Sequence, residues 1–471
     1  MRKNVFWGAG KVGCRMCKLW DSFGIRPDYI FDNNRELEGL YCNGIIISEK
    51  EKLRLLVNPR IFVTCGSAKE VHAQIEEEYG FVDVLETSNE RDMISSLIFN
   101  RMITLKKFFL NKAQEKFNIY WDLEKGLVMG GVELWAMEMA ENMNNKGYRC
   151  KYISTDFAED TIKNEKINTI QIPYADLGYV EGLTICYNEI IQNSPCNVVC
   201  NFAGLNFLAA CMAKSDLHDK VRIIAVIHGD SEDYYKRYKQ LNDYVDFCLV
   251  VSSRIEQKMI LRGMQKDKIK YLDWEINCEK ELKRKWSKDG DKLQLGYAGR
   301  ITVDDKRADL LLVLASILID RNIDFQMNIA GMGKYSTILQ SQIDKYGYQN
   351  YISLVGYVER KDIFDFWIKQ DIMLSCSDIE GHSISQSEAM SAGAVPIITD
   401  VSGARDDVTE GYNGFIVGVG ELEKMADKIC FLYNNRKELE KMGIYAYESV
   451  YKKQEELKQM NFWETLLIKD T

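Results

Sequence analysis

The chain has 471 residues, of which 46% are hydrophobic and 11% aromatic, so it is not globally disordered and can fill several packed cores. With one domain per ~150 residues as a guide, this length fits about three domains. Lysine and arginine number 61 against 70 acidic residues, a net charge of −9. That balance argues against a general nucleic-acid binder, since such a protein would carry a basic surface.

The beginning of the chain does not resemble a secretion signal. Gly8 and Gly10 interrupt its apolar run, and no cleavage-site pattern follows. No apolar run reaches the ~18 residues that a membrane-spanning helix needs. The 13 cysteines are scattered rather than framing short loops, which is typical of reduced, buried thiols. We therefore expect a cytoplasmic protein, acting either free in the cytoplasm or at the inner face of the membrane.

Residues 1–88 are predicted to form a small Rossmann-like α/β module. A strand at 4–7 precedes a G-x-G-x-x-G loop, and a second strand ends at Asp32; the glycines are Gly8, Gly10 and Gly13. In Rossmann folds such glycines let the backbone hold a phosphate at a helix N-terminus, and an acid ~20 residues further on holds ribose hydroxyls. The module is interpreted either as a second nucleotide site or as a docking module that keeps the loop for tight packing.

Residues 89–117 are predicted to form a connecting amphipathic helix. Apolar residues recur at helical spacing, and four lysines cluster toward the end, Lys106, Lys107, Lys112 and Lys116. A basic amphipathic helix can lie on an anionic membrane surface, but such a helix also commonly packs between domains. Peripheral membrane contact is therefore the second interpretation.

Two further α/β units follow, because strand-like apolar runs alternate with helical patterns in the way that gives parallel sheets covered by helices. The first, at 118–277, has a glycine loop at Gly130 and Gly131 before a helix. The second, at 278–455, begins with a polar linker. Residues 456–471 are predicted to form a helix that crosses back.

The 278–455 unit carries an ordered series of segments with chemistry-bearing residues. Its first strand ends before Arg300, and Lys306 follows. Glu380 and Glu388, eight positions apart, flank the start of a helix that begins after Gly381. The remaining segments are glycine-containing strand ends and loops at 328–333, 354–358 and 411–417.

In this order and spacing the segments resemble the C-terminal half of the retaining family 4 glycosyltransferases, which have the GT-B fold. The resemblance covers roughly residues 118–455 and is strongest at 293–417. It implies two facing Rossmann-like domains, an N-terminal acceptor domain and a C-terminal nucleotide-sugar donor domain, preceded here by the small module. The implied activity is transfer of a hexose to a glycan or lipid-linked glycan. A UDP-sugar is the donor that family frequency favours, with GDP-mannose as the alternative.

The resemblance assigns Arg300 and Lys306 to the donor diphosphate. Both lie just beyond a strand end, where ligands of doubly wound sheets bind. Two fixed cations there would neutralise the charge that develops on the leaving group. Arg307 stands where many relatives have glycine, so the local turn differs from the common pattern.

The resemblance assigns the two glutamates different tasks. Glu388 is implied to accept hydrogen bonds from the ribose, and Glu380 to face the reacting sugar and stabilise positive charge on it. No enzymic nucleophile then remains of the kind that retaining glycosidases use. The family's favoured account is attack by the acceptor on the same face of the sugar, with the departing phosphate taking the acceptor's proton, so that the anomeric configuration is retained.

Further residues are expected around the donor because of where they lie. His228 ends a strand of the 118–277 unit, and it is expected to hydrogen-bond the donor sugar or to shuttle a proton; the alternative is a satisfied core histidine. The other positions implied to bind the donor are Gly130, Gly131, Gly331, Gly333, Gly381, His382 and Ser383.

Neither a metal nor an obligatory cofactor is expected, since the nucleotide sugar is a substrate. The only Asp-x-Asp tripeptide, Asp289-Gly-Asp291, precedes a strand rather than following one. Cys14 and Cys17 form a C-x-x-C, but no second pair or histidine cluster completes a zinc site.

Two other functions remain open. A nicotinamide-dependent sugar-nucleotide enzyme centred on residues 1–88 would need a Tyr-x-x-x-Lys pair, which the first 110 residues lack. A catalytically inactive glycan-binding GT-B protein is disfavoured by the joint presence of four residues, Arg300, Lys306, Glu380 and Glu388.

Overall fold

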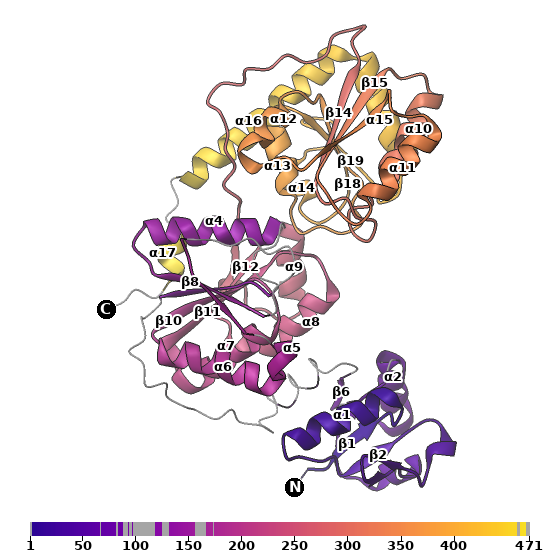
Figure 1. Ribbon diagram of the computed structural model, residues 1–471, viewed down its shortest axis with the longest axis vertical. Coiled ribbons are helices and arrows are strands. Elements are labelled where there is room, and N and C mark those ends of the chain that lie inside the picture. Colours follow the sequence, from indigo (N-terminus) through magenta and orange to yellow (C-terminus); the bar gives the residue numbers. More distant parts are fainter. Residues whose placement is uncertain are drawn as a thin grey trace. The chain divides into compact units, whose positions relative to one another are not determined.

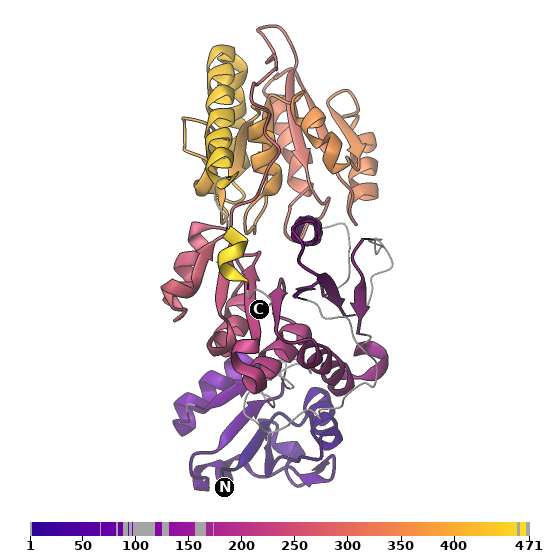
Figure 2. The same cartoon turned by 90° about the vertical axis from the view of Figure 1, so that its left-hand side faces the viewer.

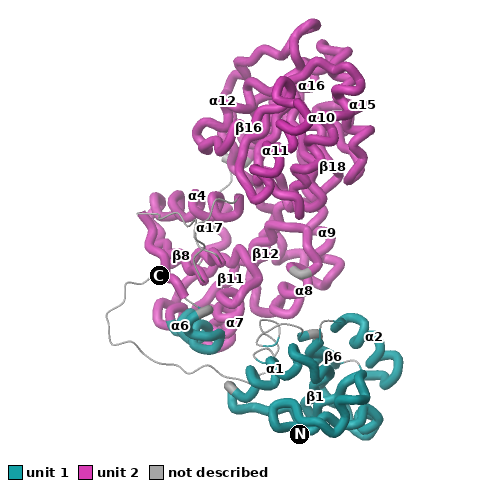
Figure 3. Tube along the Cα trace, turned by 45° about the vertical axis from the view of Figure 1, so that its right-hand side comes forward, with its two compact units in different colours: residues 1–110, 174–188 teal, residues 111–173, 189–471 magenta. Residues whose placement is uncertain are grey.

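The structure is a computed structural model that describes residues 2–65, 67–81, 83–87, 93, 97, 118–124, 131–155, 166–172, 174–458 and 462–467. It divides into two compact units, which Figure 3 shows in different colours. The first consists of residues 1–110 and 174–188, and the second of residues 111–173 and 189–471.

The first unit holds a four-stranded parallel sheet in the order β2-β1-β5-β6. Successive residues of β1 enter different cores: Phe6 packs with Trp20, and Trp7 packs in the cluster that contains Ile75. This alternation follows from the two-residue period of a strand. The elements are β1 (Asn4–Trp7), α1 (Lys11–Ser22), β2 (Tyr29–Phe31), η1 (Arg35–Leu37), β3 (Tyr41–Cys42), β4 (Ile45–Ile46), η2 (Lys50–Leu55), β5 (Arg60–Val63), α2 (Ala68–Tyr79) and β6 (Val84–Glu86) (Figure 1).

The second unit begins with a seven-stranded parallel sheet in the order β13-β12-β11-β10-β7-β8-β9. The central strands β10 and β11 are almost wholly buried, as expected for a parallel sheet covered on both faces. Its elements are β7 (Ile119–Asp122), α4 (Gly131–Asn145), β8 (Cys150–Ser154), β9 (Thr169–Gln171), β10 (Cys196–Cys200), α7 (Leu205–Leu217), η3 (His218–Lys220), β11 (Val221–Ile227), α8 (Glu232–Leu241), η4 (Asn242–Tyr244), β12 (Phe247–Val250), α9 (Ser253–Leu261), η5 (Lys266–Lys268) and β13 (Ile269–Tyr271). In the sequence, two helices stand between β9 and β10, α5 (Tyr174–Leu177) and α6 (Tyr179–Gln192), and residues 174–188 belong to the first unit.

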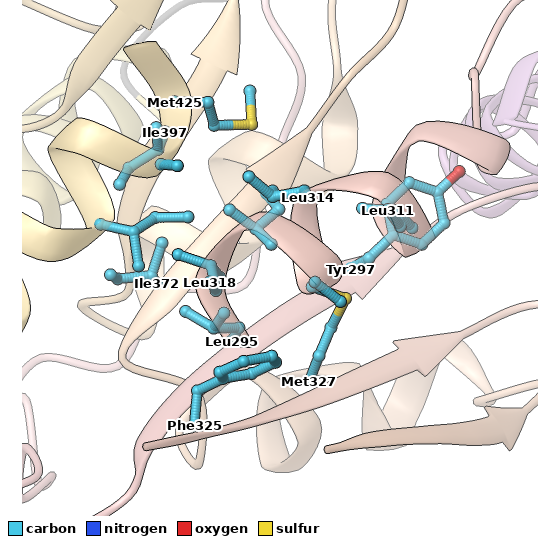
Figure 4. Close-up of a cluster of buried hydrophobic side chains, with 14 of the residues drawn as sticks. Leu295, Tyr297, Leu311, Leu314, Leu318, Phe325, Met327, Ile372, Ile397 and Met425 are labelled. Atoms are coloured by element: carbon cyan, nitrogen blue, oxygen red, sulfur yellow. The ribbon is translucent and has the colours of Figure 1, made fainter. Parts of the chain in front are cut away.

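A six-stranded parallel sheet follows, in the order β16-β15-β14-β17-β18-β19, with helices on both of its sides (Figure 2). Figure 4 shows its main core, where Leu295 and Phe325 of adjacent strands lie beside Leu318. Its elements are β14 (Leu293–Ala298), α10 (Asp309–Asp320), β15 (Phe325–Ala330), α11 (Ser336–Tyr346), β16 (Ile352–Gly356), η6 (Arg360–Asp362), α12 (Ile363–Trp367), β17 (Ile372–Ser375), α13 (Ile384–Ser391), β18 (Val395–Thr399), α14 (Ala404–Asp407), β19 (Phe415–Val417), α15 (Leu422–Asn434) and α16 (Arg436–Lys458).

The end of the chain returns to the seven-stranded sheet. On α16, the Gln454 side chain accepts a hydrogen bond from the Ile276 N–H and donates one to the Trp274 carbonyl, both at 2.9 Å. The short helix α17 (Phe462–Leu466) places Trp463 against Trp121, with ring centroids 5.5 Å apart. The tail was predicted as one helix over 456–471; among the described residues, 456–458 end α16 and the separate helix α17 packs on the seven-stranded sheet.

The connecting helix expected at 89–117 lies outside the described residues, except for Met93 and Leu97, which are buried in a core of the first unit. In the described part of the chain, no helix combines the length and the hydropathy needed to cross a bilayer.

Candidate active site

Lys306, predicted to bind the diphosphate, and Glu380, predicted to face the sugar, lie together at the carboxyl ends of two adjacent strands, β14 and β17. Lys306 Nζ lies 2.5 Å from Glu380 Oε1, and both side chains are largely buried. Ser377 Oγ donates to the same carboxylate oxygen at 2.8 Å. The Asp378 N–H donates to the Asp305 carbonyl at 3.0 Å, which joins the two loops. Lys306 and Glu380 thus neutralise each other in this structure, and their burial strengthens the attraction between them.

Arg300 lies on the same loop, with its side chain 55% exposed, and its Nη2 is 2.6 Å from Asp305 Oδ2. The Thr302 hydroxyl donates to the other oxygen of Asp305 at 2.6 Å. Burial would raise the pKa of Asp305, but the Thr302 hydrogen bond and the Arg300 and Lys306 charges outweigh it and hold that pKa below its usual value. Because a surface ion pair contributes little to stability, a diphosphate can replace Asp305 as the partner of Arg300 at small cost.

Arg307 occupies a backbone conformation that usually belongs to glycine. Its φ is 50°, in the left-handed region, which costs a side-chain-bearing residue about 1–2 kcal/mol. Its guanidinium lies 3.0 Å from Asp378 Oδ2 and 3.2 Å from Asp309 Oδ2. These two carboxylates raise the pKa of Arg307 and hold the arginine in a turn that glycine would make without strain.

We expect Arg307→Ala to lower the free energy of unfolding by about 1 kcal/mol more than Arg307→Gly does. Both variants lose the contacts with Asp309 and Asp378, but only alanine keeps the left-handed strain. Urea unfolding of the two variants at one pH measures the difference. Equal transition midpoints would show that the turn relaxes out of the left-handed region.

Gly381 lies where the two sheets of the second unit meet. A Cβ atom at this position would lie 1.9 Å from the His228 carbonyl oxygen. Gly403, with a φ of 82°, is similarly tight, since its Cβ would lie 2.7 Å from the Gly381 carbonyl oxygen. Nearby, Ser252 Oγ lies 2.8 Å from Ser402 Oγ. Gly381 was predicted to admit a ligand closely, and the close approach found is to the chain's own backbone.

His228 follows β11, is partly buried, and contacts two tryptophan rings. Its Nε2 lies 2.9 Å from Asn201 Oδ1. The ring centroid is 5.2 Å from that of Trp135 and 6.0 Å from that of Trp274. Burial lowers the pKa of His228 to about 3, so the ring is uncharged at neutral pH. Its Nδ1 has no hydrogen-bond partner among the described residues.

A buried chain of charges holds His382. Its Nε2 lies 3.2 Å from Asp407 Oδ2, and both side chains are nearly inaccessible. Lys453 Nζ lies 2.9 Å from Asp407 Oδ1 and 2.6 Å from Asp273 Oδ1. Burial would raise the pKa of Asp407, but the His382 and Lys453 contacts outweigh it and hold that pKa well below its usual range. Asp407 therefore stays ionised and fixes the orientation of the His382 ring.

Two helix starts lie close together beside these residues. Ser383 caps α13, where its side chain accepts a hydrogen bond from the Gln386 N–H, as serine commonly does at this position. Gly131 begins α4, and a Cβ there would lie 3.8 Å from Ile384 Cδ1. Helix starts carry free N–H groups that favour an anion. Gly130 lies outside the described residues.

The ionised form of Glu388, in α13, is disfavoured by its surroundings in the protein. Burial raises its pKa to about 7; the charge of Arg360 partly opposes this shift and the charge of Glu138 adds to it. Arg360 Nη1 lies 2.7 Å from Glu138 Oε2. None of the described residues donates a hydrogen bond to the Glu388 carboxylate, so its ionised form lacks a partner in this structure.

Gly331 and Gly333 pack against the loop that carries Arg300. A Cβ at Gly331, whose φ is 126°, would lie 1.9 Å from the Gly299 carbonyl oxygen. A Cβ at Gly333 would lie 2.3 Å from the Ile301 carbonyl oxygen. Both stay predicted donor positions, and in this structure both pack tightly against the loop that carries Arg300.

In the first unit, the glycine loop is bound to the acid that follows β2. Asp32 Oδ2 accepts a hydrogen bond from the Ala9 N–H at 2.6 Å, and its Oδ1 accepts one from the Asn34 N–H at 2.8 Å. A Cβ at Gly13 would lie 1.8 Å from the Gly8 carbonyl oxygen, whereas one at Gly10 would meet nothing within 4 Å. Packing therefore explains Gly13 but leaves space beside Gly10, just before α1.

Several residues at this site were not predicted from the sequence. Asn201 directly follows the buried strand β10, and a polar residue in such a place is a usable signal. Asp407 and Lys453 carried no signal, because Asp407 reaches His382, and Lys453 reaches Asp407, only through the packing of α14 and α16. Arg360, near Glu388, likewise comes from a distant segment.

Sequence comparison finds relatives for the part of the chain that carries Arg300, Lys306 and the two glutamates. Residues 279–449 match the family described as "Glycosyl transferases group 1". The poly(ribitol-phosphate) alpha-N-acetylglucosaminyltransferase of Staphylococcus aureus is 27% identical over 162 residues, covering 34% of this chain and 32% of the relative, so the match spans about a third of that relative. The N-acetyl-alpha-D-glucosaminyl L-malate synthase of Bacillus anthracis is 20% identical over 367 residues, covering 72% of this chain and 93% of the relative.

The fold likeness extends over most of the chain. S. aureus TarM, in its crystal structure with UDP, fondaparinux and alpha-GlcNAc-glycerol, superposes with a TM-score of 0.60 at 13% identity, covering 74% of this chain and 99% of that one. The likeness confirms the predicted fold class, α/β with parallel Rossmann-like sheets arranged as in GT-B structures. Residues 279–449 are accordingly a Glycosyl transferases group 1 domain, and they form the second half of a GT-B fold.

Proposed function

We propose that the protein is a retaining hexosyltransferase that acts without a metal ion. It would move a hexose from a nucleotide sugar, taken to be a UDP-sugar, to a glycan acceptor in surface polysaccharide or glycoconjugate synthesis. The observation that carries the proposal is the buried Lys306–Glu380 ion pair, which adjoins Gly381 and the strand end at His228. The names of the relatives, both of them enzymes of N-acetylglucosaminyl compounds, support the reaction class.

The residues have separate tasks in this proposal. Lys306 and the exposed Arg300 bind the donor diphosphate, and their charge stabilises the leaving group as the glycosidic bond breaks. Arginine offers a planar fork suited to phosphate oxygens. When the diphosphate takes Lys306 as its partner, Glu380 is released toward the positive charge that develops on the sugar. Glu388 accepts hydrogen bonds from the ribose, and these supply the partner that its carboxylate lacks.

The sugar itself is placed against the strand ends. His228 hydrogen-bonds it, the starts of α4 and α13 favour the nearby phosphate, and His382 and Ser383 line the start of α13. The acceptor hydroxyl attacks on the face that the diphosphate leaves, and the departing phosphate oxygen takes its proton. A lipid-linked acceptor would bring the protein to the inner face of the membrane.

Nucleoside diphosphate release from a panel of UDP-, GDP- and ADP-sugars tests the proposal. We expect release with one base, undiminished by EDTA, and a product with the anomeric configuration of the donor. Binding of glycans without any release would favour an inactive glycan-binding protein. Reduction of a nicotinamide cofactor would favour a sugar-nucleotide enzyme centred on residues 1–88.

The space beside Gly10 favours a second proposal for residues 1–88, a non-catalytic site for a nucleotide or a partner protein. We expect Asp32→Ala to abolish a second nucleotide-binding event seen by calorimetry without changing the first, because Asp32 holds the glycine loop at the Ala9 N–H. Thermal unfolding of the variant is the control for damage to the module. A single binding event in both proteins would favour partner docking.

A further inference from the structure

We propose that Asn201 is a positioning residue that fixes the tautomer of His228 and makes this histidine a hydrogen-bond acceptor rather than a proton shuttle. The inference rests on the proposed function and specifies how His228 works in it. The geometry that carries it lies at the carboxyl ends of three adjacent strands, β7, β10 and β11.

The orientation of the Asn201 amide is fixed from the neighbouring strand. Its Nδ2 donates to the Asp122 carbonyl at 3.0 Å, at the end of β7. Because the nitrogen is used there, the oxygen is the atom that lies 2.9 Å from His228 Nε2. An amide oxygen only accepts hydrogen bonds, so Nε2 must carry the hydrogen. In a neutral ring, Nδ1 is then the nitrogen with the lone pair.

The surroundings keep the ring neutral. Asn201 is fully buried, and the ring of His228 lies against Trp135 and Trp274, which offer no counter-charge. Burial alone lowers the pKa of His228. Its Nδ1 is a buried acceptor without a partner among the described residues, and such an atom costs about 1–3 kcal/mol until a donor reaches it. A hydroxyl of the donor sugar would be such a donor once the side chains that cover Nδ1 in this structure move aside.

Ionisable groups on the neighbouring segments are engaged elsewhere. Asp230 lies 2.6 Å from Lys258 and Glu380 lies 2.5 Å from Lys306. His382 contacts Asp407, and Asp122 accepts a hydrogen bond from Asn206 at 2.8 Å. None of these groups contributes to the lowered pKa of His228, so the neutral tautomer depends on burial and on Asn201.

A chemical consequence follows for the proton of the acceptor. A general base works best when its pKa lies near the working pH, and His228, whose Nε2–H faces the Asn201 oxygen and whose pKa burial lowers, is poorly suited to that task. When the acceptor oxygen forms its bond to the anomeric carbon and the bond to the diphosphate breaks, the acceptor's proton passes to the departing phosphate oxygen. His228 keeps its hydrogen on Nε2 throughout.

The tautomer can be measured directly. The chain has four histidines, so long-range ¹H–¹⁵N spectra of ¹⁵N-histidine-labelled protein are tractable, and His228→Gln identifies the signal. We expect a ring protonated at Nε2 and bare at Nδ1, unchanged between about pH 5 and 8. A ring protonated at Nδ1, or one that titrates in this range, would overturn the proposal. This result does not depend on transfer activity, so it stands apart from any failure of the proposed function.

Substitution of Asn201 separates positioning from packing. In Asn201→Asp a carboxylate faces Nε2 and favours the imidazolium, so His228 should acquire a titration near neutral pH. The kcat should then fall to a lower plateau below that new pKa, since only the neutral ring accepts a hydrogen bond at Nδ1. The wild-type protein should show no such acid limb from His228.

Asn206→Ala is the matched control for Asn201→Ala. Both asparagines are buried and both donate to Asp122, but only Asn201 contacts His228. We expect both alanine variants to lose stability, and only Asn201→Ala to lose the uniform Nε2–H signal. An unchanged signal in Asn201→Ala, or an unchanged pH profile in Asn201→Asp, would contradict the positioning role.

Discussion

Lys306→Ala is expected to slow transfer by roughly 100- to 1,000-fold, about 3–4 kcal/mol of transition-state stabilisation. The loss arises because a fixed, largely buried cation is removed from the place where the diphosphate would gain charge. Turnover at saturating nucleotide sugar measures it. Arg300→Ala should have a comparable effect, because it removes the second cation, which is exposed to solvent and pairs with Asp305 rather than with Glu380.

Lys306→Ala also leaves the Glu380 carboxylate without its cation, and binding measurements separate the two effects. Calorimetry with nucleoside diphosphate should show weaker binding to Lys306→Ala. Glu380→Gln should bind the diphosphate at least as well as the wild type, since it frees Lys306, while losing turnover. Lys441→Ala, which removes a surface pair with Glu438, is the control. Near-normal turnover in both Lys306→Ala and Arg300→Ala would exclude these cations from the site.

Glu388→Gln is expected to stabilise the unliganded protein by about 3 kcal/mol above neutral pH. Burial raises the pKa of Glu388 from 4.5 to about 7. Between these values the folded carboxyl keeps a proton that the unfolded one has released, so stability falls as pH rises through this window. A tenfold change in the acid dissociation constant corresponds to ~1.4 kcal/mol. Glutamine carries no such penalty.

Urea unfolding from about pH 4.5 to 8 tests this expectation. The wild-type and Glu388→Gln curves should converge at the acid end and diverge toward pH 8. Glu440→Gln, at an exposed position of α16, should follow the wild type throughout. Parallel curves for wild type and Glu388→Gln would show that solvent reaches the Glu388 carboxylate.

The same variant should bind nucleotide more weakly, because an amide accepts weaker hydrogen bonds from ribose hydroxyls than a carboxylate does. Wild-type affinity should rise with pH through about 7 as Glu388 ionises, and Glu388→Gln should lose that dependence. A gain in stability together with a loss of affinity would identify Glu388 as a binding residue.

The fold could be predicted because its signals are local. Strands such as Val221–Ile227 are apolar except at Arg222, and helical patterns separate them, which indicates parallel sheets. The order of the site segments around Arg300 and Glu380 was also readable. What could not be predicted is which atoms meet, because that depends on strand order and on helices that return from far along the chain.

The glycines illustrate this limit. Some of their positions mark a close approach and others, such as Gly10, do not, and a sequence does not show what approaches. At Gly331 and Gly381 it is backbone of the same chain, at Gly299 and His228. At Arg307 a conformation typical of glycine occurs without a glycine, because the Asp309 and Asp378 carboxylates hold the arginine there.

Helix α16 connects the six-stranded sheet of the second unit with the seven-stranded one. Its first half packs in the core of the six-stranded sheet through Leu439 and Met442, and toward its other end Gln454 bonds to the segment after β13. Lys453, between them, holds Asp407 on one side and Asp273 on the other. A hinge rotation of one sheet against the other would stretch one of these two contacts. Such a rotation would thereby change the distance between the Lys453 charge and one of its two carboxylates. The electrostatic potential at His382, beside the start of α13, would change with it.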